Sequence, residues 1–400
     1  MNDAAPHPDA TPRAFLIVRL GALGDIVHAL PLAAALRTTW PDARIDWLVD
    51  VKHRAILDYV DGLSAIVPVD TRRLRGDTGV VSVVARLRAA RYDVAIDAQG
   101  LLKSATLAHL AGARRAIGLG PRHLREPLAR WAYDDTAEPS GPHVVDHALA
   151  LAQTAGAVTG PPRFALQPPA SDVVARVRAA LGLAAGQPFA ILNPGAAWPN
   201  KRWPADRFGA IAHHVRTRHG WPSVVVWGPG EEDLALAVVA AAGAGATALA
   251  PPTSLGDLLA LVTAAGLVVS GDTGPLHLAA AIATPIVGLY GPTDPARNGP
   301  WSPADVTLSR NRTCACHYQR RCTAAVWCLG ELGVDEVAAA VDRRLAAVAG
   351  PGSRDMTSAP DRTVTPDRTG TPDRTGTPDR TGTPDRTGTP DRTGTKEIDR

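Results

Sequence analysis

Short apolar runs alternate with longer helical segments through most of the chain. The runs typical of buried strands lie at 14–20, 45–50, 65–70 and 93–98. The segments expected to be helical lie at 26–40, 52–60, 80–90 and 100–112, with a kink expected at Pro31. Strands that alternate with helices in this way predict an α/β fold built on a doubly wound parallel sheet.

A second set of alternating elements begins near residue 189. FAILNPG and SVVVWGPG have the pattern of strands that end in turns. A helix is expected over 204–218, and the apolar residues on one of its faces are Phe208, Ile211, Ala212 and Val215. The pattern weakens from about 115 to 145, and Pro and Gly cluster at 160–169. We therefore predict two domains, at 13–165 and 166–350, with a last helix at 334–349.

The two ends of the chain have a different character. Residues 1–12 lack the apolar core of a signal peptide, and we expect them to form a disordered leader. The hexapeptide TPDRTG recurs from 365 to 394 with almost no apolar residues. Such a segment buries too little surface to offset its chain entropy, so residues 351–400 are predicted to be a disordered tail.

The stretch 267–292 reads as strand, turn, helix and strand. Its turn, Ser-Gly-Asp-Thr-Gly-Pro-Leu-His, places Pro275 where a first helical residue is expected. A helix start at the carboxyl end of a parallel strand favours an anion such as a phosphate. Asp272 and His277 are candidate ligand-binding residues there, although Asp272 can instead cap the helix and His277 can pack in the core. A second Gly-Asp-Thr-Gly at 76–79, in what looks like an exposed connection, is a coincidence.

Composition narrows the classes of function. The chain has 400 residues, of which 45% are hydrophobic and 4% aromatic, and its net charge is +3. Such a balance gives no support to a nucleic-acid partner. No apolar run is long enough for a transmembrane segment. We expect a cytoplasmic protein that can still touch a membrane surface.

The chain has four cysteines, Cys314, Cys316, Cys322 and Cys328. Their spacing, C-x-C-x5-C-x5-C, is not a standard zinc pattern. A metal site, a redox cluster and reduced thiols in a loop all remain open.

Two further turns carry candidate chemistry in the first half and the second. Asp25 follows the turn Gly21-Ala22-Leu23-Gly24, and it can act either as a general base or as a helix cap. This turn lacks the G-x-G-x-x-G fingerprint of a dinucleotide site. Lys201 lies in a polar loop after NPG, where it can neutralise a phosphate or remain solvated.

Glu231 and Glu232 follow the turn Trp-Gly-Pro-Gly. An acidic residue at a helix start stabilises the helix dipole, which is one reading of this pair. A carboxylate beside a ligand site can also accept hydrogen bonds from the hydroxyls of a ribose. The sequence does not distinguish the two glutamates.

Several motifs together resemble one family. IVRLGALGDIVHALPLAAALR, DAQGLLKSA, NPGAAWPNKRWP and SGDTGPLHLAAA with LYGPTDP are similar to segments of the lipopolysaccharide heptosyltransferases, most of all those of the heptosyltransferase I type. The resemblance implies a GT-B architecture of two Rossmann-like domains, the first for the acceptor and the second for the nucleotide sugar. It implies inverting transfer of L-glycero-D-manno-heptose from ADP-heptose to a Kdo residue of the lipopolysaccharide inner core, with no metal and no cofactor.

The resemblance also implies roles for particular residues. By its position in the matching motif, Asp25 resembles the general base of the family. The residues that match donor-binding positions are Lys201, Asp272, Thr273, Gly274, His277, and either Glu231 or Glu232. Candidates for contacts to the anionic Kdo-lipid A-type acceptor are Lys103, Arg122 and Arg125, although these charges can also simply be solvated.

Two other functions remain open. One is a GT-B glycosyltransferase that uses another nucleotide sugar. The motifs do not distinguish it, because no residue that recognises the sugar can be identified in the sequence. The other alternative is a non-catalytic nucleotide-sugar-binding protein, or a protein scaffold with the repeat tail as its partner-binding part. A Rossmann dehydrogenase is disfavoured because the glycine fingerprint is absent.

Overall fold

The computed structural model describes residues 12–349, and in this range the chain forms two parallel sheets of six strands each. The first sheet has the strand order β3-β2-β1-β4-β5-β6. Its strands are β1 (Ala14–Val18), β2 (Arg44–Asp50), β3 (Ala65–Val69), β4 (Val94–Asp97), β5 (Arg115–Leu119) and β6 (Asp135–Ala137). Its helices are α1 (Leu23–Thr39), α2 (Val80–Ala90), α3 (Leu102–Leu110) and α4 (Val144–Thr154).

The second sheet repeats the same winding, with the order β12-β11-β10-β7-β8-β9. Its strands are β7 (Ala190–Asn193), β8 (Ser223–Val225), β9 (Thr247–Leu249), β10 (Leu267–Gly271), β11 (Ile286–Tyr290) and β12 (Val306–Ser309). Its helices are α5 (Val173–Ala180), α6 (Ala205–His219), α7 (Glu232–Ala242), α8 (Leu255–Ala264), α9 (Gly274–Ala281), α10 (Pro295–Asn298) and α11 (Val334–Ala349). The predicted doubly wound fold is confirmed.

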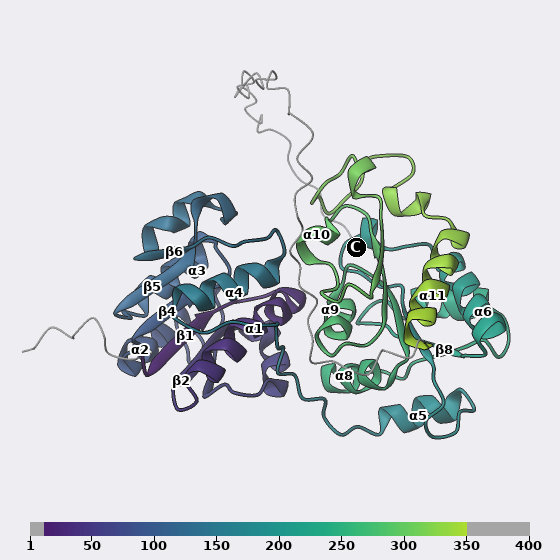
Figure 1. The fold of residues 1–400 in the computed structure, drawn as a ribbon, viewed down its shortest axis with the longest axis horizontal. Coiled ribbons are helices and arrows are strands. Elements are labelled where there is room, and N and C mark those ends of the chain that lie inside the picture. The colour runs from purple at the N-terminus through teal and green to yellow at the C-terminus, as the bar shows by residue number, and fades with distance from the viewer. Residues whose placement is uncertain (1–11, 350–400) are drawn as a thin grey trace, which may run out of the picture. The chain divides into compact units, whose positions relative to one another are not determined.

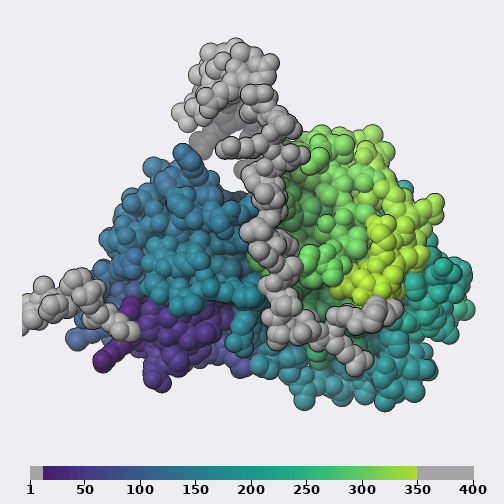
Figure 2. Space-filling model, in the orientation of Figure 1, coloured from purple at the N-terminus to yellow at the C-terminus, as the bar shows by residue number. Residues whose placement is uncertain are grey.

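Helices cover both faces of each sheet, because the strands are apolar on both sides. In Figure 1 helices α1 and α4 lie on one side of the first sheet, and these two helices pack against each other. The central strand β1 buries Phe15 and Ile17 on one face and Leu16 and Val18 on the other. Helix α11 completes the second half, and its outer side forms the yellow surface in Figure 2.

Helix α1 is buried nearly all round because it packs on its own sheet and on α9 of the second half. The helix continues through Pro31, and the kink expected there stays a prediction. Gly24 permits the approach to α9, because a Cβ atom at this position would lie 2.2 Å from Cδ2 of His277. Gly274 has the matching role in α9, where a Cβ atom would lie 2.6 Å from Cδ2 of Leu23. The starts of α1 and α9 therefore touch.

Most of the expected elements are present, but the weak pattern from 115 to 145 hid strands β5 and β6 and the start of α4. Strand β6 has only three residues, Asp-Thr-Ala, so it shows no apolar period. The second Gly-Asp-Thr-Gly lies in an exposed connection, as expected, and the predicted helix after it is α2, which buries Val83 and Leu87.

The division into two domains stays a prediction. The last helix of the first set, α4, ends at Thr154, and α5 begins at Val173. Nearly the whole leader and the entire tail lie outside the described residues. Within residues 12–349 no helix is long and apolar enough to cross a membrane.

The contact between α1 and α9 gives a first prediction. Gly24→Ala places a methyl group against the His277 ring, and we expect a loss of about 1–3 kcal/mol in the free energy of unfolding. Urea denaturation of the purified variant measures this loss. Gly160→Ala is the matched control, because a Cβ atom there has nothing within 4 Å. Equal stabilities of the two variants would contradict the proposed close approach.

Candidate functional site

A buried carboxylate, Asp272, organises the turn between β10 and α9. Its Oδ2 accepts hydrogen bonds from Lys201 Nζ at 2.5 Å and from Thr293 Oγ1 at 2.7 Å. Its Oδ1 accepts from Asn298 Nδ2 at 2.7 Å and lies 3.1 Å from His277 Nε2. Four side chains from four parts of the second half therefore converge on one carboxylate.

Charge stabilises this arrangement. Burial opposes ionisation of Asp272, but the hydrogen bonds and charges of His277 and Lys201 outweigh it and hold its pKa well below the usual range. Lys201 ends the short 3-10 turn Pro199–Lys201, and its ammonium lies 4.5 Å from the centre of the Trp198 ring. The Lys201 side chain keeps 14% of its surface exposed, whereas Asp272 keeps 3%. The lysine therefore presents a fixed positive charge at the edge of the site.

Helix α9 begins one residue earlier than the sequence suggested. Thr273 is its N-cap residue, Gly274 is the first helical residue and Pro275 the second. The cap interpretation of Asp272 is therefore wrong. The Thr273 side chain does not cap the helix either, because its Oγ1 accepts from Asn193 Nδ2 at 2.9 Å. The side chains around the helix start are thus held by one another.

His277 connects this cluster to the first half of the chain. It is buried, as its packing interpretation suggested, yet it also contacts Asp272. Its ring lies 4.5 Å from the ring of His28 on α1, centre to centre. Burial is the largest of the effects that lower the pKa of His28 well below its usual value, so this ring is neutral near pH 7. Sequence patterns did not single out His28, since it lies among apolar residues of a buried helix.

Asp25 is the third residue of α1, and the N-cap position is occupied by Ala22. The alternative in which Asp25 is the cap residue is therefore wrong, although its carboxylate accepts a hydrogen bond from Ala22 N at 3.1 Å. The other oxygen lies 2.9 Å from Nη2 of Arg19, and 47% of the side-chain surface is exposed. The carboxylate is therefore oriented by neighbours and accessible.

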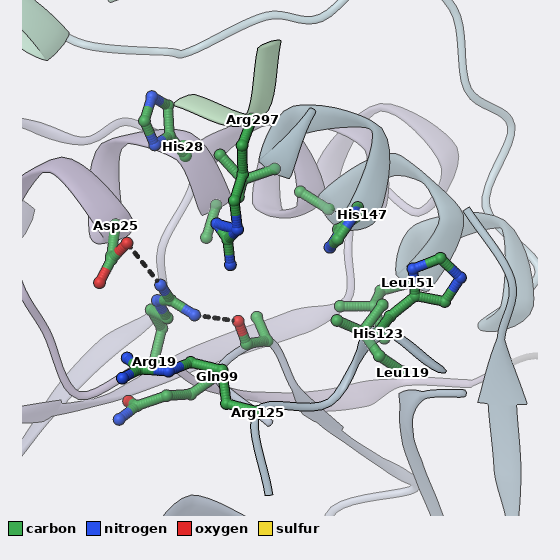
Figure 3. Close-up of a pocket in the computed structure, with 14 residues that line it drawn as sticks. Arg19, Asp25, His28, Gln99, Leu119, His123, Arg125, His147, Leu151 and Arg297 are labelled. Atoms are coloured by element: carbon green, nitrogen blue, oxygen red, sulfur yellow. Dashed lines mark hydrogen bonds and ion pairs between the residues drawn. The ribbon is translucent and has the colours of Figure 1, made fainter. Parts of the chain in front are cut away.

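A pocket opens beside Asp25. Figure 3 shows the carboxylate directed toward Arg19, with the Arg297 side chain extending into the same space. Arg297 belongs to α10, so both halves of the chain line this pocket. Burial, followed by the charge of Arg297, lowers the pKa of His147 to about 4, so this ring is neutral near pH 7. The polar lining residues are Arg19, Asp25, His28, Gln99, His123, Arg125, His147 and Arg297.

The three acceptor candidates do not gather in one place. Arg125 lines the pocket beside Asp25. Arg122 lies on the exposed 3-10 turn Pro121–His123, and Lys103 donates to Thr71 Oγ1 at 3.2 Å at the start of α3. Neither Lys103 nor Arg122 lines the pocket. Arg19 and Arg297 do line the pocket. The sequence gave no sign that these two residues meet, because they lie far apart in the chain.

The side chains of Glu231 and Glu232 have different surroundings. Glu231 is the N-cap residue of α7, and its Oε2 accepts from Gly228 N at 3.1 Å. A Cβ atom on Gly195 would lie 2.0 Å from the same oxygen, so Glu231 faces the glycine turn after β7. Glu232 begins α7 and is exposed. Of the two glutamates, only Glu231 is held against the turns at Gly228 and Gly195, which follow strands β8 and β7.

Two doubly wound sheets, turns at the carboxyl ends of their strands and a basic pocket lined from both halves together define a GT-B-like protein. Residues 80–328 match the model of glycosyltransferase family 9 (heptosyltransferase). The chain belongs to this family, as the sequence motifs implied, and it is an enzyme that transfers a glycosyl group.

Individual relatives agree with this assignment. Lipopolysaccharide heptosyltransferase 1 of Pseudomonas aeruginosa is 30% identical over 316 residues, which are 77% of this chain and 87% of that protein. The fold is similar to that of E. coli heptosyltransferase WaaC with ADP, with a TM-score of 0.64, 24% identity, and coverage of 83% of this chain and 98% of that one. The structure of E. coli ADP-heptose lps heptosyltransferase II is also similar, with a TM-score of 0.66 and 21% identity. That match covers 84% of this chain and 100% of the other.

The convergence on Asp272 gives a second prediction. Asp272→Asn removes the negative charge opposite Lys201, and we expect a loss of about 3–5 kcal/mol in the free energy of unfolding at pH 7. Because the pKa of Asp272 is lowered in the folded state, its contribution is present above about pH 4 and fades as pH falls further. Denaturation curves of both proteins between pH 7 and pH 3 measure the difference.

The control for this variant is Asp172→Asn. Asp172 pairs with Arg176 at 3.2 Å, but its side chain is 78% exposed, so the loss should stay within about 1 kcal/mol. If Asp272→Asn were as mild as this control, Asp272 would not organise the site.

Proposed function

We propose that this protein transfers L-glycero-D-manno-heptose from ADP-heptose to a Kdo residue of the lipopolysaccharide inner core, with inversion at the anomeric carbon. The observation that carries the proposal is the contact between the starts of α1 and α9. One helix start carries the accessible carboxylate of Asp25, and the other adjoins the cluster of Asp272, Lys201 and His277. A base and an anion site thus lie within the reach of one bound sugar nucleotide.

The donor binds on the side of the second sheet. Its diphosphate lies at the start of α9, where the backbone N–H groups of Thr273 and Gly274 and the helix dipole favour negative charge. Lys201 supplies a positive charge whose position is set by Asp272. Glu231 is the better placed of the two glutamates to accept the ribose hydroxyls, since it faces the turn at Gly195. A solved structure of E. coli WaaC with ADP-2-deoxy-2-fluoro heptose supports this choice of donor.

The acceptor binds in the pocket beside Asp25. Arg19, Arg125 and Arg297 line it, and guanidinium groups match the geometry of carboxylates such as that of Kdo. Lys103 and Arg122 lie outside the pocket and contact more distant anionic groups of the lipid-linked acceptor. Because this acceptor is a lipid, the enzyme meets it at the cytoplasmic face of the inner membrane.

The transfer is a single displacement. Asp25 accepts the proton of the acceptor hydroxyl while that oxygen attacks the anomeric carbon of the heptose. The bond from this carbon to the diphosphate breaks on the opposite side, and ADP leaves with the electron pair. Lys201 and the amides at the start of α9 stabilise the charge that develops on the leaving phosphate. The reaction as proposed uses no cofactor and no metal ion.

The third prediction concerns the proposed base. Asp25→Asn keeps the shape of the side chain but removes its basicity, and we expect a fall of about 10²–10⁴ in kcat. Binding of ADP-heptose, measured by calorimetry, should remain within about twofold because Asp25 lies on the acceptor side. Asp77→Asn, in the second Gly-Asp-Thr-Gly, is the matched control and should leave kcat unchanged. An active Asp25→Asn enzyme would remove Asp25 from the mechanism.

The choice of donor is tested directly by a fourth experiment. Purified protein is incubated with a Kdo-lipid A acceptor and, in parallel, ADP-heptose, ADP-glucose or UDP-glucose. Mass spectrometry should show one heptose added to the acceptor only with ADP-heptose, and NMR should show the inverted anomeric configuration. Transfer from another donor alone would replace the proposed substrate while leaving the fold and family as they are.

A further inference from the structure

All four cysteines of the chain lie in the connection between β12 and α11, from residue 310 to residue 333. Its only regular elements are the short 3-10 turns Asn311–Thr313 and Cys328–Glu331. Connections of this length without helices or strands are uncommon in compact domains and usually have a function. The position of the cysteines in it therefore needs a physical reason.

The cysteines form a small core of their own. Cys314, Cys316 and Cys328 are buried, Cys322 packs against them, and no other side chain of the described residues belongs to this cluster. Elsewhere in residues 12–349 the core clusters consist of aliphatic and aromatic side chains. A core made of four sulfur atoms is too small to hold a polar connection by the hydrophobic effect alone.

The sulfur atoms are linked in one series of contacts. Sγ of Cys314 lies 3.4 Å from Sγ of Cys316, Cys322 interacts with Cys316, and Cys328 interacts with Cys314. All four cysteines are free thiols.

The cluster borders the donor side of the active site. Asn200, the residue before Lys201, donates through Nδ2 to Gln319 O at 2.9 Å and to Cys316 Sγ at 3.4 Å. Tyr318 N donates to Pro292 O at 3.0 Å, beside Thr293. These contacts connect the cysteine segment to two of the loops that supply partners of Asp272.

We propose that Cys314, Cys316, Cys322 and Cys328 together bind one divalent metal ion of the zinc or ferrous class, which fixes this connection against the donor site. Soft thiolate ligands select such ions, and four of them give a closed tetrahedral site without a position for substrate. Binding releases four protons as the four thiols become thiolates, and no electron is transferred. The role is structural, and it is separate from the transfer chemistry.

The surrounding charge suits this site. Four thiolates and one divalent cation carry a net charge of −2. The same segment contains Arg312, Arg320 and Arg321 against one acidic residue, Glu331, while Arg310 pairs with Glu336. In a tetrahedral zinc site the sulfur atoms lie about 3.8 Å apart, given a Zn–S distance of about 2.3 Å. The Sγ atoms of Cys314 and Cys316, 3.4 Å apart, lie close to this spacing, and Cys322 is half-buried. No three of the sulfur atoms lie within 4.8 Å of one another, so the proposal requires that binding of the ion draw them together.

A second group of metal-ligand type serves as a comparison. His214, His219 and Asp342 are the one group in residues 12–349 with three ligand atoms all within 4.8 Å of one another. Both imidazoles contact the same oxygen, Oδ1 of Asp342, at 2.8 and 2.6 Å. Hydrogen bonds between α6 and α11 account for this group, and it provides a matched control.

The test measures metal content in the full chain. Protein purified under reducing conditions should contain about one equivalent of zinc or iron by elemental mass spectrometry, and this measurement distinguishes the two metals. The double variant Cys314→Ser with Cys328→Ser should lose at least tenfold of this metal, whereas His214→Ala should retain it. Replacement by Co²⁺ should give the visible spectrum of a tetrahedral thiolate site.

A second measurement covers the case in which the cysteine variants fail to fold. Stepwise modification of the wild-type protein by a mercurial should release the metal in proportion to four titrated thiols. A protein without metal, a mass that shows disulfide bonds, or metal lost only with His214→Ala would each overturn the proposal. Metal content is measured without any transfer assay, so its outcome is independent of the donor and acceptor proposed above.

Discussion

The ionised carboxylate of Asp272 is the constraint on which the proposed active site depends. A buried carboxylate is costly unless its oxygen atoms are satisfied, and here Lys201, His277, Thr293 and Asn298 supply the partners. The same interactions that stabilise the charge also position Lys201 at the edge of the site and orient the start of α9. One buried charge thereby holds several loops of the second half in place, which is the preorganisation that the proposed stabilisation of a leaving phosphate requires.

The contact between the halves depends on small residues as much as on charge. Gly24 and Gly274 allow the starts of α1 and α9 to meet, and the His277 ring fills the space that a side chain on Gly24 would occupy. His277 thus contacts Asp272 on one side and His28 on the other. Asp25 lies one residue beyond Gly24, and its position relative to the anion site follows from this packing. The apolar surroundings of α1 therefore have a direct consequence for the chemistry.

The connection with the four cysteines extends the same logic away from the reacting groups. Asn200 holds the backbone of this segment next to Lys201, and Tyr318 holds it next to Pro292. The segment has few apolar side chains and no long helix or strand, so its order relies on contacts of other kinds. A metal ion at the cysteines would stabilise the back of the donor site without touching the substrate.

The sequence by itself determined the class of fold and the turns that carry the candidate site residues, because strand and helix periods and strand–turn–helix motifs are local properties of the chain. It also pointed to Asp25, Lys201 and the segment from Asp272 to His277, since each follows a turn after a strand. Only the tertiary structure showed that Asp272 binds Lys201, that Glu231 and not Glu232 faces the turn at Gly195, and that Arg19 and Arg297 share a pocket. These are contacts between residues far apart in the chain, and they arise from packing and from the satisfaction of buried charge, which no local pattern encodes.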